Sequence, residues 1–190
     1  MTSRLSGLFN KNKNSQKIVV YGFENSGKTS FISNFIKNGK EVKSESSSIG
    51  TMNIDLKYGN HHLNIWDING SLQNCNIWHH YLVNASAIIF ILDAYDPLTW
   101  TESIKFLERL LKKKESKHIP LLIIGSKQDK LGEKSINVSG NVNAQLIPLM
   151  DTNRWIQFFL VSAVTGYGFK ESVKVLLKSI KSEKRKSDFV

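Results

Sequence analysis

One short segment of this sequence combines residue types that bind phosphate. Residues 22–29 read Gly-Phe-Glu-Asn-Ser-Gly-Lys-Thr, after an apolar run at 18–21 and before a helix-like stretch at 30–37. In a strand–loop–helix context, glycines let backbone N–H groups turn toward phosphate oxygens, and the helix N-terminus adds partial positive charge. Lys28 would reach the β- and γ-phosphates, and the Thr29 hydroxyl would ligate Mg2+. The segment predicts a nucleoside triphosphate site.

A second pair of residues fits the metal and the terminal phosphate. Asp67 and Gly70 directly follow the apolar run 63–66. An aspartate at a strand end can hold Mg2+ through water, and a glycine N–H can meet the γ-phosphate. A turn or cap at the end of a strand also uses aspartate, but the distance from the first loop favours the Mg2+ interpretation for Asp67.

A third group of residues suggests which base is bound. Ser126, Lys127 and Asp129 follow the apolar run 120–125. Asp129 can accept two hydrogen bonds from the edge of guanine, which adenine cannot supply, and the Lys127 stem can lie along the flat base. Ser162 and Ala163 could place a backbone N–H near guanine O6. In isolation the segment with Asp129 is better interpreted as a surface turn and the segment with Ser162 is a weak signal, whereas beside a phosphate loop they indicate guanine.

The elements that position these residues alternate along the chain. Apolar runs predict strands, and segments with helical periodicity predict helices between them, which gives an α/β fold. We expect a mostly parallel six-stranded sheet with one antiparallel strand and helices on both faces. Residues 58–60 read as a hairpin turn and residues 44–48 as a serine-rich loop. The expected strands are 17–21, 54–58, 63–66, 87–92, 120–125 and 156–161, and the expected helices 30–37, 97–113, 141–150 and 170–180.

Composition limits the class of protein. The 190 residues include 41% hydrophobic side chains and one cysteine, Cys75, and they carry a net charge of +10. No apolar run has the length of a membrane span, and the N-terminus lacks the apolar core of a signal peptide, so we expect a cytoplasmic protein. The basic clusters fit attraction to anionic lipid or an acidic partner, or solvated helix ends. Nucleic acid is not an expected partner, because no basic stripe is interleaved with stacking aromatics.

The order and spacing of these motifs resemble a small GTPase, and within that superfamily the Arf and Arf-like branch. The resemblance covers nearly the whole chain and implies a P-loop small GTPase fold. It also implies a GTP/GDP switch with Mg2+, effector and regulator proteins bound through two switch regions, and a role in membrane, vesicle or ciliary trafficking. The segments that carry the resemblance are 24–29, 49–50, 65–67, 78–81, 127–129 and 162–164.

The resemblance assigns roles to individual residues. The Mg2+ ligands would be Thr29, Ser48 and, through water, Asp67. Trp66 and Tyr81 match two aromatics of an effector-facing cluster, although ordinary packing explains them equally well, and Thr51 stands at the third position. The nucleotide-binding residues would be Glu24, Asn25, Ser26, Gly27, Lys28, Thr29, Ser30, Gly70, Ser126, Lys127, Asp129, Ser162 and Ala163.

Three positions near the nucleotide depart from the family pattern. Ser71 replaces the glutamine that orients the attacking water, so no catalytic residue is assigned and intrinsic hydrolysis is expected to be weak. Whether the protein is an enzyme therefore stays open, and the alternative is a non-hydrolysing pseudo-GTPase that serves as a scaffold. Ser126 replaces an asparagine that helps recognise guanine, which predicts weaker binding. Asn69 replaces a glycine, and asparagine tolerates a positive φ better than most residues.

The ends of the chain are expected to be separate from the nucleotide-binding domain, residues 16–182. Residues 1–15 predict an amphipathic segment and linker, and residues 183–190 a basic flexible tail. Thr2 stands where many Arf proteins have the glycine that is myristoylated, which excludes that modification. Any attachment to anionic membrane would therefore be peripheral, weak and reversible. We expect the protein to be a monomer.

Overall fold

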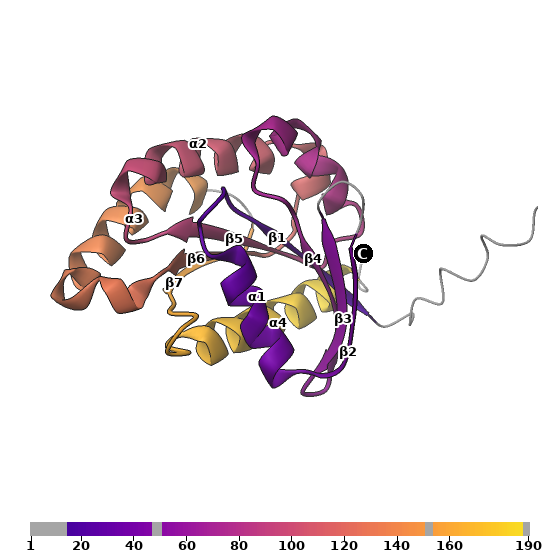
Figure 1. The fold of residues 1–190 in the computed structure, drawn as a ribbon. Coiled ribbons are helices and arrows are strands. Elements are labelled where there is room, and N and C mark those ends of the chain that lie inside the picture. The colour runs from indigo at the N-terminus through magenta and orange to yellow at the C-terminus, as the bar shows by residue number, and fades with distance from the viewer. Residues whose placement is uncertain (1–14, 47–50, 151–153, 188–190) are drawn as a thin grey trace, which may run out of the picture.

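A computed structural model describes residues 15–46, 51–150 and 154–187 of the chain. It has a seven-stranded sheet with the order β2-β3-β4-β1-β5-β6-β7 (Figure 1). The strands are β1 Gln16–Tyr21, β2 Lys40–Ser46, β3 Met52–Tyr58, β4 His61–Asp67, β5 Ala87–Asp93, β6 Leu121–Ser126 and β7 Ile156–Leu160. The α-helices are α1 Lys28–Asn38, α2 Trp100–Leu111, α3 Ser135–Met150 and α4 Phe169–Ser187, and a 3-10 segment spans Leu72–Leu82.

The strand directions confirm the predicted mostly parallel sheet. Strands β4, β1, β5, β6 and β7 pair in parallel, and β3 pairs antiparallel with both β2 and β4. Tyr58 pairs with His61 across the predicted hairpin turn. The carboxyl ends of the five parallel strands therefore lie on the same side of the domain, where α/β proteins bind their ligands.

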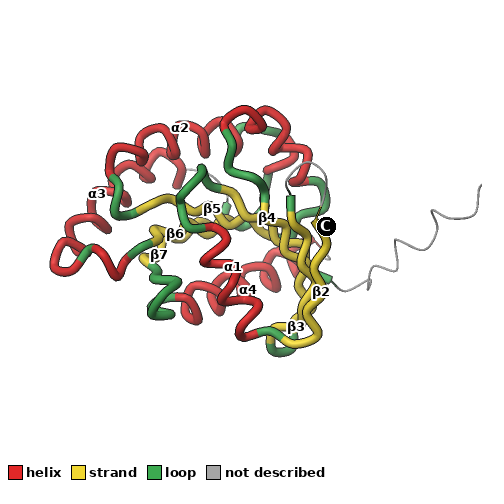
Figure 2. Tube along the Cα trace, viewed as in Figure 1, coloured by secondary structure: helices red, strands yellow, loops and turns green. Residues whose placement is uncertain are grey.

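Both faces of the sheet are covered, as predicted. Helices α2 and α3 lie on one face and α1 and α4 on the other (Figure 2). In β5, Ile88, Phe90 and Leu92 join the core on the α2–α3 side, whereas Ile89 and Ile91 join the core on the α1–α4 side. A central strand that is buried on both faces reads as a continuous apolar run, which is why the sequence identified β5.

The predicted number of strands was wrong because β2 has no apolar pattern. Its residues are all exposed, and it pairs only with β3, at the edge of the sheet. Charged side chains are common on edge strands because they discourage pairing with other chains. Residues Ser44 and Ser46 belong to β2, so the predicted loop at 44–48 was wrong for its first three residues, while 47–50 lie outside the described residues.

Helix boundaries also differ from the prediction. Helix α3 begins at Ser135 rather than at 141. The prediction missed the first six residues of this helix because they lack apolar periodicity. Helix α4 continues to Ser187, into the stretch predicted as a tail, and residues 188–190 lie outside the described part. Residues 1–14 of the predicted amphipathic segment and linker lie outside the described residues. Among the described residues, no helix has both the length and the apolar character needed to cross a membrane.

Candidate guanine-nucleotide site

The loop between β1 and α1 has the backbone shape expected of a phosphate-binding loop. Gly22, Asn25 and Gly27 have positive φ values of 150°, 62° and 90°. A Cβ atom on Gly22 would overlap the carbonyl oxygen of Ile91, so only glycine fits there. Helix α1 begins at Lys28, two residues earlier than predicted, and has no side-chain cap. Its first N–H groups therefore face the loop without a capping side chain, as an anion site requires.

Lys28 places a buried positive charge in this loop. The residue is 8% exposed, and its Nζ donates to the carbonyl oxygen of Phe23 at 2.9 Å. Burial lowers the pKa of Lys28, although the nearby carboxylates of Asp67 and Glu24 oppose the shift. A buried ammonium group is costly unless an anion stabilises it. The position of the Lys28 ammonium group is suited to binding a phosphate.

Thr29 and Asp67 supply oxygen ligands of the kind that Mg2+ prefers. The Thr29 hydroxyl donates to Asp67 Oδ2 at 3.4 Å. Burial raises the pKa of Asp67, whereas Lys28 and the bond from Thr29 lower it. The described residues contain no cluster of three His, Cys, Asp or Glu side chains that could hold a metal. The third predicted ligand, Ser48, lies outside the described residues.

Gly70 brings the loop after β4 directly against the phosphate loop. A Cβ atom at Gly70 would lie 2.5 Å from Lys28 Nζ, 2.6 Å from the carbonyl oxygen of Gly22 and 2.7 Å from the backbone nitrogen of Glu24. Asn69 does not have the positive φ for which asparagine was considered suitable; its side chain instead accepts the Ser71 N–H at 3.0 Å. The predicted neighbours Lys28 and Gly70 are thus brought together.

The Gly70→Ala substitution is expected to weaken nucleotide binding about tenfold and to lower the free energy of unfolding by about 1–3 kcal/mol. The reason is that two of the three atoms in the way belong to backbone, which cannot move aside as a side chain can. GTP titration and urea unfolding measure the two effects. Gly140→Ala in α3 is the matched control, since nothing lies within 4 Å of its added Cβ. Equal behaviour of the two variants would contradict the packing argument.

Ser126 ties the base loop to the phosphate loop. Its hydroxyl lies 2.6 Å from the carbonyl oxygen of Ser26 and 3.1 Å from that of Leu92. The Ser126 hydroxyl therefore makes a loop-to-loop contact, but it has one hydrogen for two acceptors. A Cβ atom on Gly27 would lie 3.3 Å from the Ser126 side chain, so the two loops pack closely.

Asp129 is held by one of its oxygens. Its Oδ1 accepts a hydrogen bond from the Ser162 hydroxyl at 2.6 Å, and the residue is otherwise exposed. Ser162 is fully buried, and its oxygen accepts the N–H groups of Val164 and Thr165. The predicted base-binding segments are therefore joined, and the orientation of the Asp129 carboxylate is fixed while it remains open to a ligand.

Two residues of the site were not predicted. Asp93 forms an ion pair with Lys127, 2.5 Å from its Nζ, and so fixes the lysine beside the base loop. Asn34 in α1 donates to the carbonyl oxygen of Ala163 at 3.1 Å. Asp93 follows an apolar run just as Asp67 does, and that position was the signal available in the sequence. Nothing in the local sequence marks Asn34.

Trp66 and Tyr81 pack against each other. Their ring centroids are 5.9 Å apart, and both residues are half-buried. Lys17 Nζ lies 4.6 Å from the centroid of the Trp66 ring, and the indole N–H donates to Asn64 Oδ1. Thr51, at the third position, is buried. Packing is therefore observed, while recognition of a partner by these rings stays a prediction.

Comparison with known proteins agrees with this site. The pattern of the ADP-ribosylation factor family matches residues 1–180. ADP-ribosylation factor-like protein 1 of Saccharomyces cerevisiae is 31% identical over 187 residues, which cover 96% of this chain and 99% of the relative. ADP-ribosylation factor-like protein 2 of Dictyostelium discoideum is 30% identical over 168 residues, which cover 87% and 88%.

A solved structure shares the fold. The Arl6 BBS3 small GTPase from Trypanosoma brucei, determined with the bound nucleotide analogue GppNp, superposes with a TM-score of 0.74 at 21% identity. The match covers 89% of this chain and 99% of that one. At this identity the likeness concerns the fold, and the family match and the relatives carry the rest. The chain belongs to the ADP-ribosylation factor family of small GTPases, the branch that its motifs predict.

Proposed function

We propose that this protein is a GTP-binding molecular switch with weak intrinsic hydrolysis that acts in membrane, vesicle or ciliary trafficking. One observation supports nucleotide binding more than any other: Ser126 joins the phosphate loop to the base loop at 2.6 Å. Groups suited to the phosphates and a carboxylate suited to guanine are thereby fixed relative to each other. Pre-positioned groups lose little entropy when a ligand binds.

Each end of the site has a distinct task in this proposal. Lys28 and the N–H groups at the start of α1 hold the phosphates, and Thr29 and Asp67 hold Mg2+, the latter through water. Mg2+ would neutralise charge on the phosphates. Asp129 accepts two hydrogen bonds from guanine, and the Lys127 stem lies against the base while Asp93 restrains its ammonium group. Effectors and regulators would bind where the phosphates order the neighbouring loops.

The direct test of nucleotide binding is to identify the nucleotide that co-purifies and then to titrate GTP, GDP and ATP with and without Mg2+. We expect guanine nucleotides to bind in preference to ATP and Mg2+ to tighten the binding of GTP. Preferential binding of ATP would contradict the assignment of Asp129.

The Ser71→Gln substitution is expected to raise single-turnover hydrolysis of bound GTP by about tenfold or more, because a glutamine side chain can orient the attacking water. Ser71 is too short for this task, and its backbone N–H is already bonded to Asn69. Phosphate release from preloaded protein measures the rate. Ser71→Ala is the matched control and should leave the slow rate unchanged. A marked loss of hydrolysis in Ser71→Ala would show that the native serine takes part.

The absence of glutamine at position 71 also favours a second candidate, a pseudo-GTPase scaffold that holds nucleotide for structure. A switch differs between its nucleotide states, whereas a scaffold does not. Hydrogen exchange in the segment 68–82 should therefore differ between the GTP and GDP forms of a switch. Equal exchange, with no hydrolysis, would support the scaffold.

We also propose weak, reversible association with anionic membranes. The basic residues and the amphipathic sequence at positions 5, 8 and 9 support it. Flotation of the protein with vesicles, with and without residues 1–10, tests the contribution of that segment.

A further inference from the structure

Among the three departures from the family pattern near the nucleotide, Asn69 is the one to which the proposed function gives no task. It is exposed, and it is followed by Gly70, which packs against the phosphate loop. The sequence contains two Asn-Gly pairs, residues 38–39 and 69–70. Because glycine has no side chain to shield its backbone nitrogen, that nitrogen can approach the amide of the preceding asparagine. The two pairs have the same local chemistry, so any difference between them comes from the fold.

The side chain of Asn69 is bent over the backbone nitrogen of Gly70. Its Oδ1 accepts the Ser71 N–H at 3.0 Å. The ring that this hydrogen bond closes contains both Asn69 Cγ and the Gly70 nitrogen, so it holds these two atoms in the compact arrangement of a turn. Groups held in this way react faster, because little further ordering is needed. The Ser71 N–H also stabilises the oxygen on which negative charge develops when Cγ is attacked.

A positive charge lies beside the same glycine. A Cβ atom on Gly70 would lie 2.5 Å from Lys28 Nζ, so the ammonium group is within about 4 Å of the Gly70 Cα atom. A nearby cation favours loss of a proton from an N–H group, because it stabilises the anion that forms. Within the described part of the chain, no backbone oxygen accepts the Gly70 N–H. The Gly70 nitrogen is therefore available as a nucleophile.

The other Asn-Gly pair has different surroundings. Asn38 is the last residue of α1, and its Nδ2 donates to the carbonyl oxygen of Asn34 at 2.7 Å. That bond directs the amide back along the helix. The atom closest to an added Cβ on Gly39 is the carbonyl oxygen of Phe35, at 2.8 Å, rather than an ammonium group. The pair 38–39 is thus an internal reference that lacks both features of the pair 69–70.

We propose that Asn69 is a site of spontaneous modification, at which Gly70 converts it to isoaspartate and aspartate. The Gly70 nitrogen attacks Asn69 Cγ, and its proton goes to the departing Nδ2. One C–N bond forms and another breaks, ammonia leaves, and a five-membered succinimide remains. Water then opens this ring at either carbonyl. Opening at Cγ gives aspartate, and opening at the main-chain carbonyl gives isoaspartate, in which the backbone runs through the former side chain.

Either product changes the loop that packs against the phosphate loop. Isoaspartate adds one carbon to the backbone just before Gly70, whose surroundings do not have room even for a Cβ atom. Both products also place a new carboxylate beside the phosphates, and like charges repel each other. The modified protein should therefore bind GTP roughly tenfold more weakly than the native protein. This consequence rests on the proposed function, whereas the modification itself does not.

The test is incubation of the full chain without added nucleotide at mildly alkaline pH. Peptide mass spectrometry follows the loss of each amide, and protein isoaspartate methyltransferase identifies isoaspartate. We expect Asn69 to be modified at least about fivefold faster than Asn38 in the folded protein. In urea the two rates should be equal, since the pairs have the same local chemistry. Equal or slower modification of Asn69 in the folded protein, or the same ratio in urea, would overturn the proposal.

A matched pair of variants tests the hydrogen bond from Ser71. Ser71 has a φ of −65°, the angle that proline adopts. Ser71→Pro therefore removes the N–H at a compatible backbone angle and should slow the modification of Asn69 about fivefold. Ser71→Ala keeps the N–H and should leave the rate unchanged. Modification of Asn38 in the same samples should be equal in both variants, which shows that the fold is intact. Equal rates at Asn69 in the two variants would contradict the geometric argument.

Bound nucleotide separates this proposal from the proposed function. A non-hydrolysable GTP analogue should slow the modification of Asn69 about fivefold or more, because the Gly70 N–H would donate to the γ-phosphate and the phosphates would neutralise Lys28. If titration shows that the analogue binds but the rate is unchanged, the role given to Gly70 and Lys28 in the modification is wrong. If the analogue does not bind, the proposed function fails, and the rates at Asn69 and Asn38 still decide the modification.

Discussion

Replacing Asp129 with asparagine is expected to lower the affinity for GTP by roughly 10²- to 10⁴-fold, since it removes two hydrogen bonds between the base and a charged acceptor worth about 1.5–3 kcal/mol each. In the proposed site the carboxylate accepts from both N–H groups on the edge of guanine, whereas an amide would present one donor that faces a guanine donor. Ser162 already holds Oδ1 at 2.6 Å, so the carboxylate cannot easily turn away. Xanthine has an oxygen where guanine has the amino group, so the variant should bind xanthosine triphosphate better than the native protein does.

Competition between GTP and xanthosine triphosphate for a fluorescent analogue measures this exchange of specificity. Glu133→Gln is the matched control, because it makes the same change of charge on an exposed residue four positions away. It should leave both affinities unchanged. Native affinity for GTP in Asp129→Asn would show that the base is recognised elsewhere.

Replacing Lys28 with methionine is expected to weaken GTP binding by at least about 10²-fold, because a buried ammonium group contributes charge-assisted hydrogen bonds to the phosphates. Lys37→Met, in the exposed last turn of the same helix, is the matched control. Titration with fluorescent GTP in the presence of Mg2+ measures both affinities. Similar affinities for the two variants would exclude Lys28 from the phosphate site.

The same variant should change the pH dependence of stability in the nucleotide-free protein. Burial raises the pKa of Asp67, and Lys28 opposes that shift. A raised pKa in the folded state stabilises the protein at low pH, and the contribution is lost as the pH rises through the folded value. Without Lys28 the pKa of Asp67 rises further. As the pH rises, the free energy of unfolding should therefore continue to fall to a higher pH in Lys28→Met than in Lys37→Met. Urea unfolding across the acidic pH range measures this difference, and identical curves would contradict the coupling.

The sequence predicted those elements whose burial leaves a pattern in the chain. Strand β5 is buried on both faces and reads as an unbroken apolar run. Strand β2 was missed because it is fully exposed at the sheet edge, where no apolar period is required. The start of α3 was missed for a similar reason, since its first turns carry mainly polar residues and Gly140.

The sequence by itself determined the phosphate loop and the family, because both depend on local requirements. Residues 22–29 have glycine at positions 22 and 27, where φ is positive, and a lysine and a hydroxyl at fixed spacing from them. Such constraints act within one turn of chain and are therefore visible in the order of residues. The replacement of glutamine by Ser71 was visible in the same way, so the expectation of weak hydrolysis needs no coordinates.

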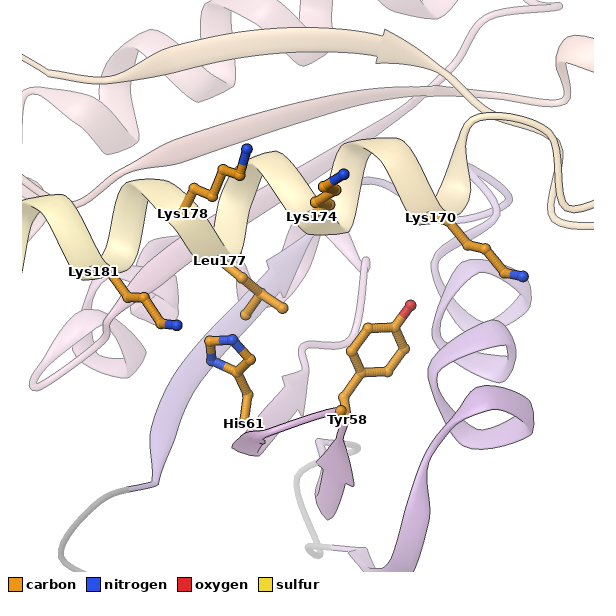
Figure 3. A pocket seen from close by; sticks show the side chains of 8 residues that line it. Tyr58, His61, Lys170, Lys174, Leu177, Lys178 and Lys181 are labelled. Carbon is orange, nitrogen blue, oxygen red and sulfur yellow. The ribbon is translucent and has the colours of Figure 1, made fainter.

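Only the tertiary structure decided how the distant segments meet. The bond from Ser126 to Ser26 joins residues 100 positions apart, and that from Asn34 to Ala163 joins residues 129 apart. A pocket lined by Tyr58, His61 and lysines of α4 likewise forms only because α4 lies beside the β3–β4 turn (Figure 3). No local pattern encodes these contacts, because they form only when parallel strands end at one edge and the helices pack across the sheet.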